Sequence, residues 1–175
     1  MHTQSDTSNR LLAWKHLVEA YQTCHQKYAR MMSHFDLTVS QFDVLTGIES
    51  LGDKATPKEV AKRLLVTKGN ITSVTRRLFE RGLIHQKSHA LDKRSIILEL
   101  TDSGKSLLTN AKLAAKQFVA QQLAPFSQSD VDLVDNLMQQ MRSHLNSKDF
   151  DFAVQGIVSQ HTSEQMNLSS MDAPQ

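Results

Sequence analysis

Two helix-start signals, eleven residues apart, constrain the fold of this chain more than any other feature. Thr56 can cap a helix, Pro57 occupies the first helical position, where a missing N–H costs nothing, and Glu59 can complete a capping box. Thr67 begins another helix, which Gly82 ends as a left-handed C-terminal residue. Because so few residues separate the two helices, the sequence predicts a helix pair joined by a very short turn.

Longer helical patterns lie on both sides of this pair. Apolar residues recur at the i, i+3, i+4 and i+7 spacing of one helix face over residues 8–35, 101–122 and 127–145. Thr38, with Gln41 at the third helical position, begins one more helix just before the pair. The chain is therefore predicted to be mostly α-helical.

The hydrophobic period changes after residue 82. Two short segments rich in apolar and β-branched residues, 83–87 and 95–100, flank a polar loop at 88–94, which is the pattern of a two-stranded hairpin. Three helices followed by a hairpin predict a winged helix-turn-helix, in which the second helix of the pair enters the major groove of DNA. The expected fold class is mostly α with this small β-hairpin.

The charge of the chain is concentrated in its middle. Residues 54–94 hold 11 of the 20 Lys and Arg residues but only 3 of the 18 Asp and Glu residues, a net charge of +8, whereas the remainder carries −6. This asymmetry indicates that the middle of the chain meets a polyanion. The predicted helix-turn-helix makes double-stranded DNA the expected partner.

Other classes of protein find no support in the sequence. It has no nucleophile elbow, no phosphate-cradling glycine loop and no paired carboxylates on a shared face, so we do not expect an enzyme. The single cysteine rules out an internal disulfide, and the eight histidines form no close ligand pair, so neither a metal nor another cofactor is expected. No apolar run approaches the roughly 18 to 20 residues of a membrane span, and the N-terminus has no secretory signal. We therefore expect a cytoplasmic protein with no membrane partner.

The second helix of the pair has the two faces that a DNA-reading helix needs. Ile71, Val74 and Leu78 form its apolar face. On the other face, asparagine can bond an adenine edge, arginine a guanine edge, and serine or threonine either a base or a phosphate. The candidate DNA-binding residues of this helix are Lys68, Gly69, Asn70, Thr72, Ser73, Arg76 and Arg77.

The hairpin tip adds a second set of candidates. Arg94 is placed to enter the minor groove, where narrow A·T-rich stretches attract a guanidinium group, and Lys87 and Lys93 suit phosphates. Asp92 alone would repel DNA, so we expect it to pair with an arginine of the wing or of the recognition helix. A solvated charged turn is the alternative, which the neighbouring helix pair disfavours.

Two segments, ITSVTRRLFERGLI at 71–84 and DKRSIILELTDSG at 92–104, resemble the MarR family of bacterial winged-helix regulators. The second segment matches the family's wing pattern of Asp, one residue, Arg and a strand ending in Leu-Thr, with Gly three residues after the Thr. The resemblance covers about residues 10–145. It implies a homodimer, usually a repressor, that binds a pseudo-palindromic operator with half-sites about one helical turn apart. Many members are released from DNA by a small lipophilic or phenolic anion that binds between the dimer helices and the DNA lobe.

This resemblance divides the chain into three regions. Residues 8–36 and 101–146 are expected to form a helical dimerisation region, and residues 37–100 the winged helix-turn-helix lobe. Residues 147–175 are expected to form a flexible C-terminal tail, with at most a short amphipathic turn at 150–158.

The sequence leaves open the signal that controls the protein. The resemblance implies a small organic effector, but the residues do not identify its site. Cys24 offers a thiol-based redox alternative, since His25 beside it could favour the thiolate, although a lone cysteine on an apolar stripe is more often a small buried hydrophobe. A helical adaptor that has lost DNA binding is a further alternative, which the intact Arg94 argues against.

Arg94 provides the first test of the wing. Arg94→Ala is expected to weaken specific DNA binding by ~1 to 3 kcal/mol, because a groove contact is lost. Fluorescence anisotropy with one specific duplex, comparing the substituted protein with the unsubstituted one, measures the change. An unchanged affinity would contradict the assignment of the wing.

Overall fold

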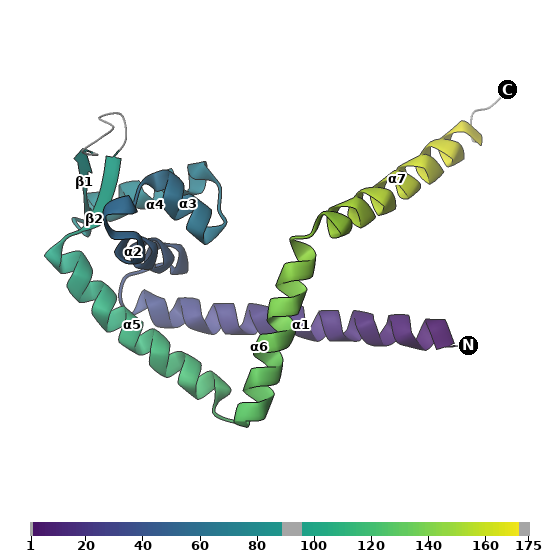
Figure 1. Cartoon of the computed structure of the whole chain (residues 1–175), viewed down its shortest axis with the longest axis horizontal. Helices are drawn as coiled ribbons and strands as arrows, with labels where there is room; N and C mark the ends of the chain where they lie inside the picture. The colour runs from purple at the N-terminus through teal and green to yellow at the C-terminus, as the bar shows by residue number, and fades with distance from the viewer. Residues whose placement is uncertain (1, 89–95, 172–175) are drawn as a thin grey trace. The chain divides into compact units, whose positions relative to one another are not determined.

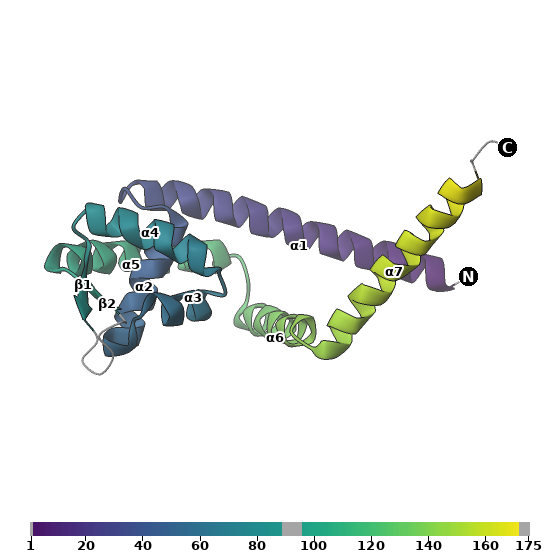
Figure 2. The ribbon, with the colours of Figure 1, turned by 90° about the horizontal axis from the view of Figure 1, so that it is seen from above.

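The computed structural model describes residues 2–88 and 96–171, and the chain separates into two compact units, Met1–Gln121 and Gln122–Gln175. In Figure 1 and Figure 2, α2, α3 and α4 gather beside the hairpin. Helix α5 runs to the end of the first unit, and α6 and α7 form the second. The elements in chain order are α1 (His2–Ser33), α2 (Val39–Leu51), the 3-10 helix η1 (Gly52–Lys54), α3 (Pro57–Leu64), α4 (Lys68–Glu80), β1 (Ile84–Ser88), β2 (Ile96–Leu100), α5 (Asp102–Leu123), α6 (Gln128–Leu145) and α7 (Lys148–Met171).

Threonine residues cap the N-termini of α2 and α4, and a left-handed glycine follows the C-terminus of α4, as the sequence predicts. Thr38 Oγ1 accepts from Gln41 N at 3.2 Å, while Gln41 Oε1 accepts from Thr38 N at 3.0 Å, so the capping box of α2 is complete. Thr67 Oγ1 accepts from Asn70 N at 3.5 Å where α4 begins. Gly82, with a φ of 66°, follows the last turn of α4 in the left-handed conformation predicted for it.

At α3 the predicted capping box is only half formed. Thr56 Oγ1 accepts from Glu59 N at 3.2 Å, and Pro57 is the first residue of the helix. The reciprocal bond from Thr56 N to the Glu59 side chain is not among the hydrogen bonds of the described residues. The reason is that Thr56 N already donates to Lys54 O at 2.8 Å in the preceding turn. The predicted cap is confirmed, and the prediction of a complete box was wrong.

The core of the first unit lies where the helices of the lobe meet the hairpin. The hairpin is antiparallel, with Ile84 opposite Leu100, and Leu98 N donates to Ala55 O at 2.9 Å, which ties β2 to the segment before α3. Removing apolar side chains from water contributes roughly 25 cal/mol per Å² and is the main force that holds such a lobe together. Side chains at most 2% exposed include Val44, Leu45, Ile48, Val60, Ile71, Leu78, Leu98 and Leu108.

One apolar stripe runs along α1, and the first unit covers only its C-terminal end. Met32 is fully buried, and Tyr28 and Phe35 pack against the core. Trp14 and Tyr21, on the same stripe nearer the N-terminus, are 65% and 66% exposed. Among the described residues, the N-terminal part of the stripe therefore remains an exposed apolar surface.

The second unit consists of two helices with exposed apolar side chains. Ser127 and Asp130 form the capping box that begins α6, and the His144 ring meets the Phe150 ring edge-on at 5.3 Å where α6 turns into α7. The apolar stripe predicted for α6 is exposed in this chain at Val134, Leu137, Met138, Met141 and Leu145.

Helix α7 extends the regular structure beyond what the sequence predicts. Instead of a short turn at 150–158, residues 148–171 form one helix. Their polar composition gives no apolar period after 158, but no proline interrupts the backbone before Pro174. Flexibility of this segment stays a prediction. No helix in the described part of the chain combines the length and the apolar character needed to cross a membrane.

Gly104 permits a close approach at the start of α5. Thr101 Oγ1 accepts from Gly104 N at 3.0 Å and donates to Gly82 O at 2.7 Å, so the cap of α5 also holds the turn after α4. A Cβ added at position 104 would overlap the carbonyl oxygen of Leu83, a backbone atom that cannot move without displacing β1.

Gly104→Ala is expected to lower the free energy of unfolding by about 3 kcal/mol or more, because a clash with backbone cannot be relieved by a rotamer change. Gly156→Ala in α7 is the matched control, since nothing lies within 4 Å of the Cβ it would add. Thermal unfolding followed by circular dichroism measures both. Equal melting temperatures for the two variants would contradict the close approach at residue 104.

Candidate nucleic-acid interface

The recognition helix, α4, turns its polar side to solvent. Ile71 and Leu78 are buried, and so is Thr75 between them, whose hydroxyl donates to Ile71 O at 2.8 Å. The Lys68 side chain lies outside the described residues. The other residues of this helix that the sequence predicts to contact DNA are all exposed, namely Gly69, Asn70, Thr72, Ser73, Arg76 and Arg77.

A contact that sequence analysis missed fixes the C-terminal end of the recognition helix. Arg81 Nη1 donates to Asp36 O at 2.6 Å and to Gln41 Oε1 at 3.5 Å, which joins the helix to the turn between α1 and α2. Gln41 is buried and also caps α2. No local motif marks Arg81, because its partners lie 45 and 40 residues away in the sequence.

The side chain of Arg76 is only weakly held by its neighbour Glu80. Its Nε lies 3.7 Å from Glu80 Oε1, but the two side chains are 71% and 61% exposed. An exposed pair of this kind contributes about 0.5 kcal/mol or less. A phosphate or a base edge could therefore displace Glu80 at little cost.

At the base of the wing, two basic side chains share one carboxylate. Glu99 Oε1 lies 3.2 Å from Lys87 Nζ, and Glu99 Oε2 lies 2.8 Å from His85 Nε2. Hydrogen bonds from His85 and then Lys87 hold the pKa of Glu99 below its usual value. The tip residues of the predicted wing lie outside the described residues, namely Asp92, Lys93 and Arg94.

Glu99 is a residue that sequence reasoning did not single out. It lies directly opposite His85 in the hairpin register. Pairing the predicted strands 83–87 and 95–100 outward from their loop would instead have placed Ile97 opposite His85, so the sequence did not mark Glu99. Lys87, which we expected to meet a phosphate, is paired with this carboxylate in the protein without DNA.

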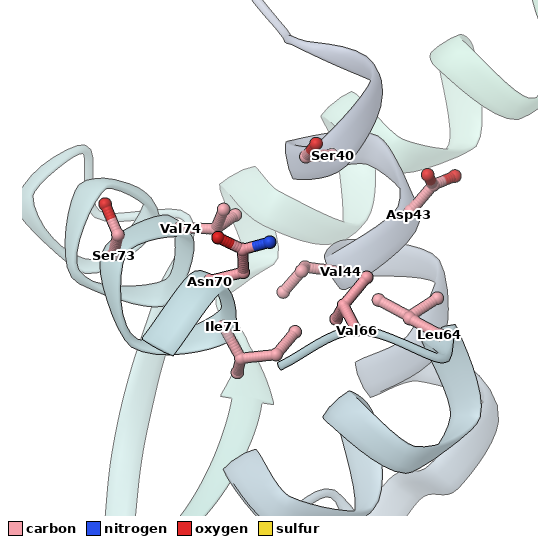
Figure 3. A pocket seen from close by; sticks show the side chains of 9 residues that line it. All are labelled: Ser40, Asp43, Val44, Leu64, Val66, Asn70, Ile71, Ser73 and Val74. Carbon is pink, nitrogen blue, oxygen red and sulfur yellow. The ribbon is translucent and has the colours of Figure 1, made fainter. Parts of the chain in front are cut away.

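A cavity of about 250 Å³ opens beside the recognition helix, next to the start of α2 and the turn that joins α3 to α4. In Figure 3, Ser40 and Asp43 belong to α2 and Asn70 and Ser73 to α4, and the Asp43 carboxylate and the Ser73 hydroxyl point away from the apolar side chains between the two helices. Most of the remaining wall is apolar. The lining residues are Ser40, Asp43, Val44, Leu64, Val66, Asn70, Ile71, Ser73 and Val74.

Among the lining side chains that the structure describes, Asp43 is the ionisable one. Burial raises the pKa of its carboxyl, and the nearby His25 of α1 lowers it only in part. Among the described residues, the hydrogen bonds and ion pairs include none to the Asp43 carboxylate. A carboxylate partly removed from water is less stable than one in solvent when a nearby charge compensates only in part, as His25 does here.

The aromatic residues of α1 divide between core and surface. The Tyr28 ring meets the Phe42 and Phe118 rings edge-on, with centroids 6.2 and 5.3 Å away, so it belongs to the core. Burial, followed by the negative charges of Asp43 and Cys24, raises the pKa of Tyr28. Cys24, the candidate redox residue, is half-buried on the same stripe.

Comparison with known proteins identifies relatives of this chain. A family model described as the MarR family matches residues 35–95. The HTH-type transcriptional regulator SarZ of Staphylococcus haemolyticus is 28% identical over 129 residues, which cover 73% of this chain and 82% of SarZ. An uncharacterized HTH-type transcriptional regulator of Bacillus subtilis, YdcH, is 30% identical over 109 residues, which cover 61% of this chain and 71% of YdcH.

Solved structures share the fold at lower identity. A mutant of MarR from E. coli complexed with operator DNA superimposes with a TM-score of 0.67 at 23% identity, covering 76% of this chain and 96% of that chain. An organohalide-sensing transcriptional regulator in its 2,4-dichlorophenol-bound form gives a TM-score of 0.71 at 18% identity, covering 79% and 84%. The predicted fold class is confirmed.

The carboxyl of Asp43 gives a pH-dependent prediction. Because folding raises its pKa, the folded state binds more protons than the unfolded chain between the two pKa values, and stability falls as pH rises through that window. Asp43→Asn is therefore expected to stabilise the protein at pH 7, with a gain that shrinks as pH falls toward about 4, the ordinary value.

Urea unfolding between pH 4 and pH 7 measures this difference. Asp53→Asn, at an exposed carboxylate just after α2, is the matched control and should show no comparable gain. A gain that grew toward low pH would contradict the direction of the Asp43 shift.

Proposed function

This chain belongs to the MarR family of transcription regulators, and we propose that it is a homodimeric repressor that binds a pseudo-palindromic operator and responds to a small-molecule effector. Members of this family are DNA-binding regulators and not enzymes. The observation that carries the proposal is the polar face of the recognition helix, exposed opposite an apolar face that is buried in the lobe.

In this proposal the recognition helix enters the major groove. Asn70 would bond an adenine edge, and Arg76 or Arg77 a guanine edge, because these side chains offer bidentate hydrogen bonds of the required geometry. Lys87 would exchange Glu99 for a phosphate. The remaining proposed contacts are Lys68, Gly69, Thr72 and Ser73 on the helix and Asp92, Lys93 and Arg94 in the wing.

The homodimer is supported by apolar surface that this chain does not cover. Trp14 and Tyr21 continue the buried stripe of α1 into solvent, and the stripe of α6 is exposed along its length. Monomeric proteins rarely leave contiguous apolar patches of this kind open. We therefore assign residues 8–36 and 101–146 to dimerisation and residues 37–100 to DNA binding.

The effector half of the proposal is supported by the 2,4-dichlorophenol-bound form of a regulator with the same fold. An aromatic molecule of that size needs a largely apolar pocket with a few polar groups.

We also propose that the protein is cytoplasmic, because a repressor of this kind acts on the bacterial chromosome.

Selection of duplexes from a randomised pool by the purified protein tests the proposal. A recovered palindrome with half-sites about one helical turn apart is the expected result. Enrichment of no sequence would favour non-specific coating, and recovery of no DNA would favour an adaptor without DNA binding. Sedimentation of the bound complex gives the number of chains per site.

Asn70→Ala is expected to weaken binding to the selected operator by ~1 to 3 kcal/mol and to relax the sequence preference at one position per half-site. Affinity for a random duplex should stay the same, because phosphate contacts supply non-specific binding. Asn136→Ala, at an exposed asparagine of α6, is the matched control. Equal losses on operator and random duplex would contradict a base contact by Asn70.

A further inference from the structure

We propose that Leu65 recognises a thymine: its exposed side chain contacts the methyl group of a thymine beside the recognition helix and sets one base preference in each half-site of the operator. Because it adds a specificity-determining residue to the DNA interface, this inference rests on the proposed function. Leu65 lies in the turn that joins α3 to α4, directly before the recognition helix.

The backbone of Leu65 has a conformation that a leucine rarely adopts. Its φ and ψ are 55° and 37°, in the left-handed region, where the Cβ of an L residue lies too close to a carbonyl oxygen. Glycine has no Cβ and is therefore the usual residue at such a helix end. Within the described part of the chain, Asp36 is the other residue besides glycine with a positive φ. The turn before the recognition helix thus keeps a bulky side chain at a conformational cost.

The turn after the recognition helix forms the same pair of hydrogen bonds with a glycine. In each turn, the left-handed residue donates its N–H to the carbonyl three residues earlier, at 3.4 Å for Leu65 and 2.9 Å for Gly82. The next N–H, that of Val66 or Leu83, donates to the carbonyl five residues earlier, at 3.1 and 3.0 Å. Since glycine completes this turn equally well, the turn itself does not require leucine at residue 65.

The side chain of Leu65 adds little to the stability of the lobe. It is 86% exposed, more than any other large apolar side chain among those that the structure describes. Its neighbours Leu64 and Val66, in contrast, line the cavity beside α4 (Figure 3). A residue that strains the backbone and gains no burial points to a partner outside the folded chain, because strain of this kind is concentrated at functional sites.

The surroundings of Leu65 identify DNA as that partner. In a helix-turn-helix, the first helix crosses the phosphate backbone and the first residues of the second helix meet the base edges, so the turn between them lies at the edge of the major groove. Lys62 and Arg63, both exposed in the last turn of α3, give this edge the positive charge that suits phosphates. Leu65 is therefore an apolar group on a surface that is otherwise suited to DNA.

Thymine is the base that offers an apolar group in the major groove. Its C5-methyl group lies beside its acceptor, whereas the other three bases are distinguished there by hydrogen-bond donors and acceptors. A leucine side chain forms no hydrogen bonds, so it distinguishes bases only by apolar contact. Asn70 and Arg76 match hydrogen-bonding edges in the proposed interface, and Leu65 adds an apolar preference beside them.

Thermal unfolding separates a role in folding from a role in binding. Leu65→Gly is expected to leave the melting temperature unchanged or to raise it, because it relieves the left-handed strain and removes almost no burial. Asp36→Gly is the matched control, since it makes the same kind of change at the other left-handed position. A lower melting temperature for Leu65→Gly would mean a structural role and would overturn the inference.

Fluorescence anisotropy with the selected operator tests the contact. Leu65→Ala keeps a Cβ at the left-handed position and removes the rest of the side chain, and Leu65→Gly removes all of it. Both are expected to weaken operator binding roughly tenfold, since the apolar contact is lost, and to leave random-duplex binding unchanged, since phosphate contacts supply it. Asp36→Gly should alter neither affinity. Operator binding by Leu65→Ala that equals that of the unsubstituted protein would sink the proposed contact.

Deoxyuridine in place of single thymines identifies the base, because the two differ only in the methyl group. At one position in each half-site, loss of the methyl is expected to weaken binding about fourfold, the contribution of one buried group of this size. This effect should disappear in Leu65→Ala and persist in Asn70→Ala, which is expected to lose a different base contact. If every methyl effect persisted in Leu65→Ala, the thymine assignment would be wrong.

The same measurements distinguish failure of the thymine contact from failure of the proposed function. If the protein selected an operator and Leu65→Ala bound it equally well, the proposed function would stand and the thymine contact would not. If the protein selected no operator, the proposed function would fail, and the base preference assigned to Leu65 would fail with it.

Discussion

The burial of one face of α4 decides where the polar residues of that helix point. Ile71 and Leu78 are almost completely removed from water, and each neighbouring residue in an α-helix is rotated by about 100°. Asn70 and Ser73 therefore have to face outward as long as the apolar face stays in the core. Thr75 lies on the buried side without disturbing it, because its hydroxyl is satisfied by the Ile71 carbonyl of its own helix.

The recognition helix is attached to the rest of its unit at its C-terminal end by two polar contacts. Arg81 joins it to the turn between α1 and α2, and Thr101 joins the turn after it to the start of α5. Gly104 allows the second attachment, because any larger residue would meet the backbone at Leu83. Since α1 and α5 carry the surface assigned to dimerisation, these contacts are where the spacing of two recognition helices in a dimer would be set.

Two carboxylates modify the strongly basic middle of the chain in different ways. Glu99 is stabilised as an anion by hydrogen bonds from His85 and Lys87. Asp43 is destabilised as an anion by burial, which the nearby His25 offsets only in part. The lobe thus contains one carboxylate that is paired with two side chains and another that is partly buried and only partly compensated.

Local patterns in the sequence determined the helices, their threonine caps, the left-handed Gly82 and the polar face of α4, because each depends on residues within one or two turns of each other. The order of three helices and a hairpin with a charged tip added the winged lobe and the wing residues, and the family resemblance added the expected dimer and its operator. Sequence reasoning did not find Arg81, Glu99 or Asp43, and it expected an irregular tail where α7 forms. The Arg81 contact and the cavity join segments far apart in the chain, and the Glu99 pairing depends on strand register. Only tertiary structure decided these features, because the hydrogen-bond partners of Arg81 and the desolvation of Asp43 exist only after the helices have packed.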